Sequence, residues 1–135
     1  MSNEKRAIFL PQMAPDPSVP MGVRIGDRFF SSSIGGIDPA TGKLGEGAEK
    51  QFELAFRNLR TLIQQAGLAT DDVSHVTVFI GDASGRQFIN KPWLETFPDE
   101  HNRPARKTTT YPLPAGVLVH LQAFAVAGGK RQPLE

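Results

Sequence analysis

The chain has 135 residues, with fifteen Lys and Arg against fourteen Asp and Glu, and its formal net charge is +1. This balance argues against the broad basic surface of a nucleic-acid-binding domain. The absence of cysteine excludes disulfides, thiolate nucleophiles and cysteine metal sites, and it fits a reducing compartment. The N-terminus lacks a secretory pattern, and no apolar run approaches the roughly 20 residues of a membrane span. We therefore expect a single cytoplasmic domain over residues 1–135, without membrane or nucleic-acid partners.

The first part of the chain predicts an arm, two strands and a loop. We expect residues 1–20 to form an extended N-terminal arm, since four prolines fall within residues 11–20. Alternating apolar residues predict strands over 21–25 and 29–33, with a turn at Gly26-Asp27. The glycine-rich residues 35–47 are expected to be a loop without regular elements.

The middle of the chain predicts two helices and a strand. Apolar residues recur at three- and four-residue steps over 48–66, which predicts an amphipathic helix; they are Phe52, Ala55, Phe56, Leu59, Leu62, Ile63 and Ala66. Gly67 is expected to end this helix, and a β-branched strand follows up to Gly81. A shorter helix is predicted from Gly85 or Gln87 to about Phe97, with Asn90 as a cap because Pro92 lies inside it.

Two strands are predicted near the C-terminus, over 105–110 and 117–127. The odd positions of the last strand are small or branched apolar residues, as a helix-covered face requires. Its even positions mix polar and large apolar groups, which is typical of a face that another subunit covers; they are Leu118, His120, Gln122, Phe124 and Val126. The order β-β-α-β-α-β-β predicts an α+β fold with both helices on one face of the sheet, assembled as an oligomer.

Most motifs of catalytic chemistry are missing. The histidines at 75, 101 and 120 match no zinc spacing, so we expect no metal, and we expect His75 and His120 to be hydrogen-bonded sheet residues. The serines at 31–33 lack a nucleophile elbow. The glycines match neither a dinucleotide fingerprint nor a phosphate loop, so no cofactor is expected.

The basic stretch "RPARKTTT", residues 103–110, is the main candidate for a binding site. Strand alternation places Arg106 and Thr108 on one face and Lys107 on the other. A guanidinium beside threonine hydroxyls can bind both oxygens of a carboxylate, although an ordinary surface arginine fits the pattern as well. We expect Arg103 and Lys107 to be solvated or interface charges.

Four stretches taken in order resemble one family over nearly the whole chain, from about Gly22 to Ala127. They are "GVRIGDRFFSSSIGGIDPATGKL", "AGLATDDVSHVTVFIGD", "FINKPWLETFPDEHNRPARKTT" and "LVHLQAFAV". Together they are similar to the RidA or YjgF family of reactive intermediate deaminases. The resemblance implies a chorismate-mutase-like fold of the bacillus type, assembled as a homotrimer with three clefts between subunits. It also implies hydrolysis of enamines and imines, such as 2-aminoacrylate and 2-imino acids, to 2-keto acids and ammonia without a cofactor.

The resemblance also assigns residues to the cleft. It places the carboxylate-binding arginine at Arg106, the cleft-lining backbone at Thr108, a strand serine at Ser32 and a helix asparagine at Asn90. This chain departs from the family by having Gln122 near the end of the last strand instead of a glutamate. It also has Ser18-Val19-Pro20 where the family has an arm tyrosine, and Ser32-Ser33-Ile34 where the family has serine-glycine-glutamine. These departures indicate a divergent member.

The mechanism that follows is a hypothesis in which a small carboxylate substrate is held by Arg106. The backbone around Thr108 and Ser33 fixes the imine, while Ser32, Asn90 and Val19 line the substrate. Gln122 orients a water molecule but cannot act as its base, because an amide only forms hydrogen bonds. The alternatives are a non-catalytic carboxylate-binding or regulatory protein, an endoribonuclease, and a different small-molecule hydrolysis.

Overall fold

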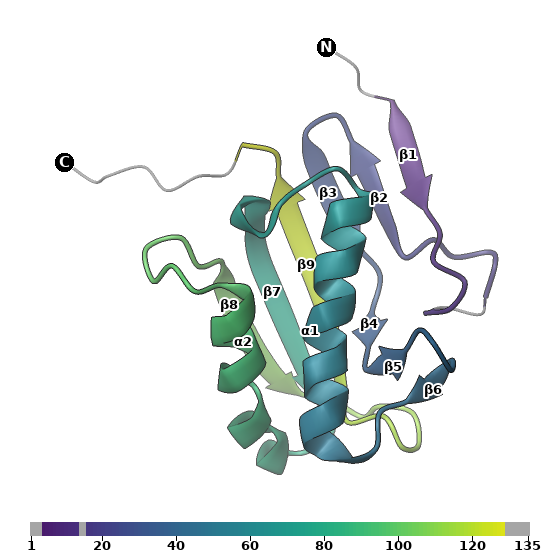
Figure 1. The fold of residues 1–135 in the computed structure, drawn as a ribbon, viewed down its shortest axis with the longest axis vertical. Helices are drawn as coiled ribbons and strands as arrows, with labels where there is room; N and C mark the ends of the chain where they lie inside the picture. Colours follow the sequence, from purple (N-terminus) through teal and green to yellow (C-terminus); the bar gives the residue numbers. More distant parts are fainter. Residues whose placement is uncertain (1–3, 14–15, 129–135) are drawn as a thin grey trace.

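The computed structural model describes residues 4–13 and 16–128, so residues 1–3 and 14–15 of the predicted arm lie outside the described part. The chain forms an α+β fold in which a mixed sheet carries two α-helices (Figure 1). The helices are α1 (Gly47–Gln65) and α2 (Asn90–Thr96), with 3-10 turns η1 (Thr70–Asp72) and η2 (Ala83–Phe88). The strands are β1 (Lys5–Ile8), β2 (Gly22–Ile25), β3 (Arg28–Ser31), β4 (Ile34–Gly35), β5 (Ile37–Asp38), β6 (Lys43–Leu44), β7 (Val73–Ile80), β8 (Ala105–Thr110) and β9 (Val119–Val126).

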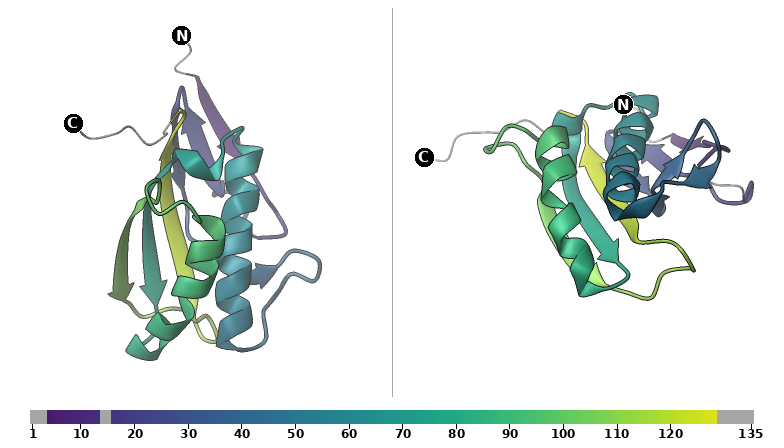
Figure 2. Two further views of the ribbon diagram at one scale, coloured as in Figure 1. Left: turned by 60° about the vertical axis from the view of Figure 1, so that its left-hand side comes forward. Right: turned by 60° about the horizontal axis from the view of Figure 1, so that its bottom comes forward.

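The main sheet has the order β1-β2-β3-β9-β7-β8, and β4 pairs with β9 beyond the end of β3. All of its neighbours are antiparallel except β7 and β8, which run parallel. A parallel pair needs a crossover connection, and η2 and α2 supply it here. Both helices consequently lie on the same side of the sheet (Figure 2). No helix in the described residues is long and apolar enough to cross a membrane.

The predicted first helix is confirmed as α1, whose apolar stripe is buried against β7 and β9. The side chains of this core are fully or almost fully buried: Phe52, Ala55, Phe56, Leu59, Leu62 and Ile63 from α1, Val76, Val78 and Ile80 from β7, and Leu121 and Ala123 from β9. At the helix end, Gly67 adopts a φ of 76°, and the N–H of Leu68 donates to the carbonyl of Ile63 at 3.0 Å. This left-handed glycine ends the helix as predicted.

The opposite side of the sheet, called the open face here, is not covered by either helix. In β9 the alternation is confirmed, since Val119, Leu121, Ala123 and Ala125 are buried while the residues between them are half-buried or exposed. On the open face Phe124 forms an edge-to-face contact with Phe30 of β3, with ring centroids 5.5 Å apart. Each of these phenylalanines is 39% exposed, so the open face carries accessible aromatic surface.

Two predicted irregular regions contain strands instead. Within the arm, β1 pairs antiparallel with β2, although its sequence Lys-Arg-Ala-Ile shows no clear apolar alternation. The glycine-rich loop contains β5 and β6, and its first residue, Gly35, belongs to β4. The side-chain nitrogen of Asn58 on α1 donates to the carbonyls of Gly35 and Ile37, at 2.9 and 2.8 Å. β1 and β4 therefore depend on partners distant in sequence, while β5 and β6 form a local hairpin that Asn58 holds through Ile37.

The predicted second helix is divided into η2 and the shorter α2. Pro92 lies in the first turn of α2, where a backbone N–H has no partner within the helix, so its ring is tolerated. The predicted cap is wrong: the N-cap is Ile89, and Asn90 is already the first helical residue. Leu94 is 47% exposed, not part of the apolar face.

Gly36 gives a test of how β4 packs on α1. A side chain at Gly36 would place its Cβ 2.8 Å from the Cα and carbonyl carbon of Gln51, which are helix backbone atoms. We expect Gly36→Ala to lower the free energy of unfolding by about 1–3 kcal/mol, because overpacking must move the helix or the strand. Chemical denaturation measures this change.

The neighbouring Gly35→Ala is the matched control. Its Cβ would meet only the His120 ring, at 3.5 Å, which is an ordinary contact. Equal stability losses in the two variants would contradict the close approach of residue 36 to α1.

Candidate functional site

Arg106 lies on the helix-covered face of β8. In the parallel pairing, Arg106 is opposite Val76 and Thr108 is opposite Val78, and both valines are buried beneath the helices. Lys107 is opposite Thr77 and lies on the open face. The predicted separation of Arg106 from Lys107 is confirmed.

Two residues of α2 hold the Arg106 guanidinium. Its Nη1 donates to the side-chain oxygen of Asn90 at 3.1 Å, and its central carbon lies 4.8 Å from the centroid of the Trp93 ring. Trp93 is itself buried and contacts the rings of Phe56 and Phe97. A cation over an aromatic face contributes about 0.5–1 kcal/mol at an exposed site. The guanidinium is therefore held in place on a rigid support.

The charge of Arg106 is not neutralised by a carboxylate. Among the described residues, none of the salt bridges includes Arg106. Partial burial, and then repulsion from the nearby Arg86 cation, lower the pKa of Arg106 from its usual value. A guanidinium is protonated at neutral pH even so. A positioned cation without an acidic partner is suited to binding an anion.

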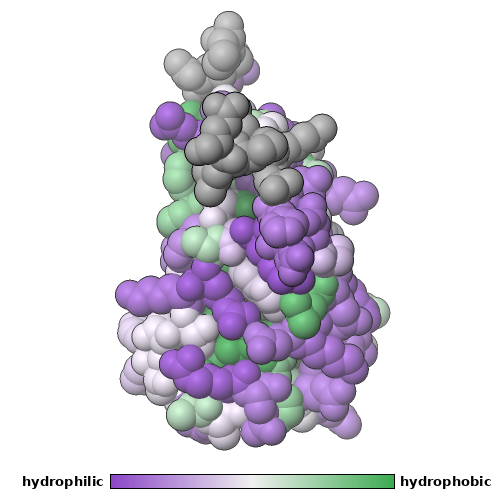
Figure 3. Space-filling model, turned by 90° about the vertical axis from the view of Figure 1, so that its left-hand side faces the viewer, coloured by the Kyte–Doolittle hydropathy of each residue, from purple (hydrophilic) through white to green (hydrophobic). Residues whose placement is uncertain are grey.

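The edge of β8 adds backbone donors beside this cation. The N–H of Tyr111 donates to the carbonyl of Ile80 at 2.9 Å, so alternation turns the N–H groups of Thr108 and Thr110 away from β7. β8 is the last strand in the sheet order of the described chain. Figure 3 views the molecule from the side of β8 and α2, where hydrophilic residues predominate. The nearer of these, the N–H of Thr108, can donate to a ligand bound by Arg106.

The other predicted site residues gather around β9 and the break between β3 and β4. The backbone N–H of Ala123 donates to the Ser31 hydroxyl at 2.9 Å, and this contact holds the bend. The Ser32 hydroxyl donates to the carbonyl of Pro20 at 2.8 Å, whereas Ser33 is exposed. Val19 is 46% exposed, and Gln122 lies half-buried on the open face.

A single chain does not bring Arg106 and Gln122 together. Gln122 is opposite Thr77 of β7, on the face that also carries Lys107, whereas Arg106 lies on the other face. β7 separates β8 from β9, so the two backbones are two strand spacings apart, roughly 10 Å. The candidate residues thus form two separate groups, one around Arg106 and one around Gln122.

His120 adds a titratable group beside Gln122. It lies on the same face of β9, opposite Phe79 of β7 and Gly35 of β4. Burial lowers the pKa of His120 below its usual value of 6.5, so the ring is mainly neutral at pH 7. The expected hydrogen bond is missing: among the described residues, none forms a hydrogen bond with the His120 ring, whose pKa is lowered by burial alone. The alternation of β9 in the sequence is sufficient to predict that His120 shares a face with Gln122.

Sequence reasoning also missed the roles of Trp93 and Arg103. Trp93 is part of an apolar pattern, and the pattern gives no sign that one ring face supports a cation. Arg103 was expected to be a solvated or interface charge, but it is half-buried and donates to the carbonyls of Phe97 and Pro98, at 2.8 and 3.3 Å. These contacts fix the loop that leads into β8.

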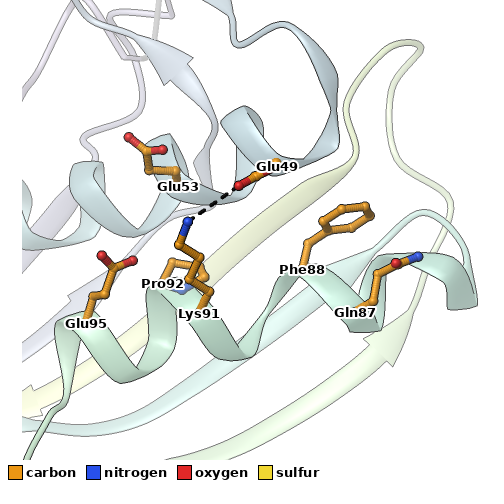
Figure 4. Close-up of a pocket in the computed structure, with 7 residues that line it drawn as sticks. All are labelled: Glu49, Glu53, Gln87, Phe88, Lys91, Pro92 and Glu95. Carbon is orange, nitrogen blue, oxygen red and sulfur yellow. Dashed lines mark hydrogen bonds and ion pairs between the residues drawn. The ribbon is translucent and has the colours of Figure 1, made fainter.

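A groove of about 230 Å³ lies between α1 and the η2–α2 segment (Figure 4). Its lining consists of Glu49, Glu53, Gln87, Phe88, Lys91, Pro92 and Glu95. Three carboxylates face one ammonium, and the Lys91 side chain points to Glu49 with an N–O distance of 3.5 Å. This negative groove disfavours an anionic ligand, and it contains no predicted site residue. The described residues include no group of His, Asp and Glu that could hold a metal ion.

Comparison with known proteins agrees with this fold. The sequence model of the endoribonuclease L-PSP family matches residues 13–127. A RutC family protein of Aquifex aeolicus is 32% identical over 118 residues, covering 83% of this chain and 94% of the relative. A 2-iminobutanoate/2-iminopropanoate deaminase of Salmonella typhimurium is 32% identical over 108 residues, covering 78% and 84%.

Solved structures of the same family share this fold. The crystal structure of Escherichia coli TdcF with bound serine superposes with a TM-score of 0.77 at 30% identity, covering 91% of this chain and 100% of that one. The chain therefore belongs to the RidA (YjgF) family of reactive intermediate deaminases, which the endoribonuclease L-PSP model describes, as a divergent member.

Proposed function

We propose that the protein hydrolyses 2-imino acids to 2-keto acids and ammonia, with the substrate carboxylate held by Arg106 in a cleft between subunits. The carrying observation is the Arg106 guanidinium, which is oriented by Asn90 and Trp93 but has no described carboxylate partner. Two relatives support this choice. One is named as a deaminase of 2-imino acids, and another was solved with serine, an amino acid that carries a carboxylate.

The proposed reaction needs little chemistry from the protein. Water adds to the carbon of the C=N bond and the nitrogen takes up a proton. The proton of the new hydroxyl group then passes to the nitrogen, the C–N bond breaks as the C=O bond forms, and ammonia leaves. The imine carbon is already electrophilic, so holding the substrate and the water together accounts for much of the acceleration. The outward N–H of Thr108 is placed to donate to the substrate beside Arg106.

The site is complete only when two subunits meet. Ser32, Ser33 and Gln122 cannot reach a ligand on Arg106 of their own chain, because the sheet lies between the two groups. We assign a homotrimer with the chorismate-mutase-like arrangement, in which the open faces are covered and each cleft combines Arg106 of one subunit with Gln122 of the next. The exposed aromatic surface of Phe30 and Phe124 supports such a cover.

His120 compensates for the missing family glutamate in this proposal. Gln122 can orient a water molecule but cannot take its proton. The neutral ring of His120 lies on the same face of the same strand and has no described hydrogen-bond partner. We assign His120 as the base and Gln122 as the residue that orients the water.

A binding protein without catalysis is the second candidate, since Gln122 replaces the expected carboxylate. Saturable binding of a 2-keto acid without ammonia release from any imine would favour it. Endoribonuclease action is disfavoured by the net charge of +1.

Arg106→Gln tests the carboxylate clamp. We expect kcat/KM for 2-imino acids generated by an amino-acid oxidase to fall about 10- to 100-fold, because a hydrogen-bonded charge pair contributes about 1.5–3 kcal/mol. Ammonia release measures this loss. Lys107→Gln removes the adjacent cation from the other face of β8 and should leave the rate near that of the wild type. Unchanged turnover in Arg106→Gln would refute the clamp.

Phe124→Asp tests the assembly. A carboxylate on the open face should convert the trimer to monomers, because burying an unpaired charge costs several kcal/mol. Light scattering coupled to size-exclusion chromatography measures the mass. Leu94→Asp changes a similarly exposed apolar residue on α2, 47% against 39%, and should keep the trimer. A monomeric wild type, or a trimeric Phe124→Asp, would contradict the covered open face.

His120→Gln tests the base through pH. In the wild type, kcat should fall as the pH decreases through the lowered pKa of His120, below 6.5, because the protonated ring cannot accept a proton. The variant should lose about 100-fold in kcat at neutral pH and should lack this acidic decrease. Rates measured between pH 5 and 8 decide this, and the same acidic decrease in both proteins would exclude His120 as the base.

A further inference from the structure

Arg86 lies beside the Arg106 site on the crossover segment. The N–H of Ile89 donates to the carbonyl of Arg86 at 3.3 Å, and the N–H of Trp93 donates to that of Ile89 at 3.1 Å, so helical turns continue from η2 into α2. In the 3-10 turn Arg86 lies on the side of Ile89, and Trp93 lies one α-helical turn further on from Ile89, so Arg86 and Trp93 are on the same side of these turns. Asn90 and Trp93 both contact Arg106, so their shared face is directed at β8.

The direction of the chain places Arg86 further along β8 than Asn90. η2 follows the C-terminal end of β7, and β8 runs parallel to β7. The C-terminal half of β8, with Thr108 and Thr110, therefore lies at the same end of the sheet as η2. Figure 2 shows η2 and α2 running back along β7 and β8 from that end. Arg86 is thus one helical turn beyond Asn90, on the side of Thr108.

Neither arginine has an acidic partner in the described chain. The described salt bridges include neither Arg86 nor Arg106. Arg86 is exposed, and it is close enough to Arg106 for its charge to contribute to the lowered pKa of that residue. Asp82, the preceding acid, accepts hydrogen bonds from the backbone and hydroxyl of Ser84 instead. Two neighbouring cations that repel each other are stabilised by a ligand with two negative charges.

We propose that Arg86 selects substrates with a second acid group, so that the preferred substrates are 2-imino dicarboxylates, the imines of aspartate or glutamate. Arg106 holds the carboxylate next to the imine carbon, and Arg86 binds the side-chain carboxylate across Thr108. The reaction is the same hydrolysis, giving a 2-keto dicarboxylate and ammonia. This inference rests on the proposed function and specifies its substrate class.

The test compares two imines in the full-length protein. A glutamate oxidase supplies 2-iminoglutarate, a general L-amino-acid oxidase supplies the imine of norvaline, and ammonia release reports hydrolysis. The wild type should prefer 2-iminoglutarate in kcat/KM. Arg86→Gln should lower that value about tenfold, mainly through KM, because a hydrogen bond between charged groups contributes about a tenfold factor. It should change kcat/KM for the norvaline imine less than about twofold. Arg86→Lys keeps the positive charge and should retain part of the preference for 2-iminoglutarate.

Lys91→Gln is the matched control. It removes a cation from the same segment, but its side chain points into the groove towards Glu49 (Figure 4). It should leave both substrates unaffected. Equal effects of Lys91→Gln and Arg86→Gln would show a general loss of positive potential and overturn the proposal.

The remaining outcomes separate the two proposals. No preference in the wild type, or equal losses on both imines in Arg86→Gln, would overturn the role of Arg86 and leave the deaminase intact. No hydrolysis of either imine would reject the proposed function. In that case calorimetry can compare the affinities of 2-oxoglutarate and 2-oxopentanoate, which tests the binding role of Arg86 without catalysis. Weaker binding of 2-oxoglutarate alone in Arg86→Gln supports the dicarboxylate site, and equal affinities in the wild type reject it.

Discussion

The apolar stripe of α1 packs into the surface formed by β7 and β9, and most of the remaining structure is arranged around this contact. The same helix also carries buried amides that bind the loops. The Gln51 side chain donates to the carbonyl of Gly116 at 2.9 Å and accepts from the N–H of Leu118 at 3.0 Å, which sets the start of β9. Asn58 binds the carbonyls on both sides of Gly36 and so places β4 next to β9. One helix therefore covers the core and determines where the open-face residues lie.

The crossover from β7 to β8 builds the cation site with residues that also belong to the core. Trp93 packs edge-to-face with Phe56 of α1, and the Arg106 guanidinium lies over the face of the Trp93 ring. A cation above a buried ring keeps its place at little cost in side-chain entropy, because the support is already fixed by packing. The parallel pairing of β7 and β8 gives Arg106 its side of the sheet. The position of α2 over the sheet thus determines the Arg106 site.

Periodicity was sufficient to predict α1, the alternation of β9 and the separation of Arg106 from Lys107, because burial on one side leaves a repeating pattern in the sequence. It could not predict β1 or β4, since these short strands form against partners distant in the chain. It also missed β5 and β6, because a two-residue strand is too short to show a repeating pattern. The family resemblance singled out Arg106 and Asn90, which the structure brings into contact. It could not show that Gln122 faces the other way, because alternation within a strand does not define its phase relative to another strand. Arg86 was missed for a different reason, since only the turn of η2 into α2 directs it towards β8.

The position of β8 at the edge of the sheet has a consequence for solubility. An edge strand with free N–H and C=O groups is a template for pairing with other chains, and such pairing leads to aggregation. β8 carries Arg106 on one face and Lys107 on the other, so an approaching strand meets a positive charge whichever side it aligns with. The arginine that would hold a ligand thus also protects the edge on which the ligand would bind.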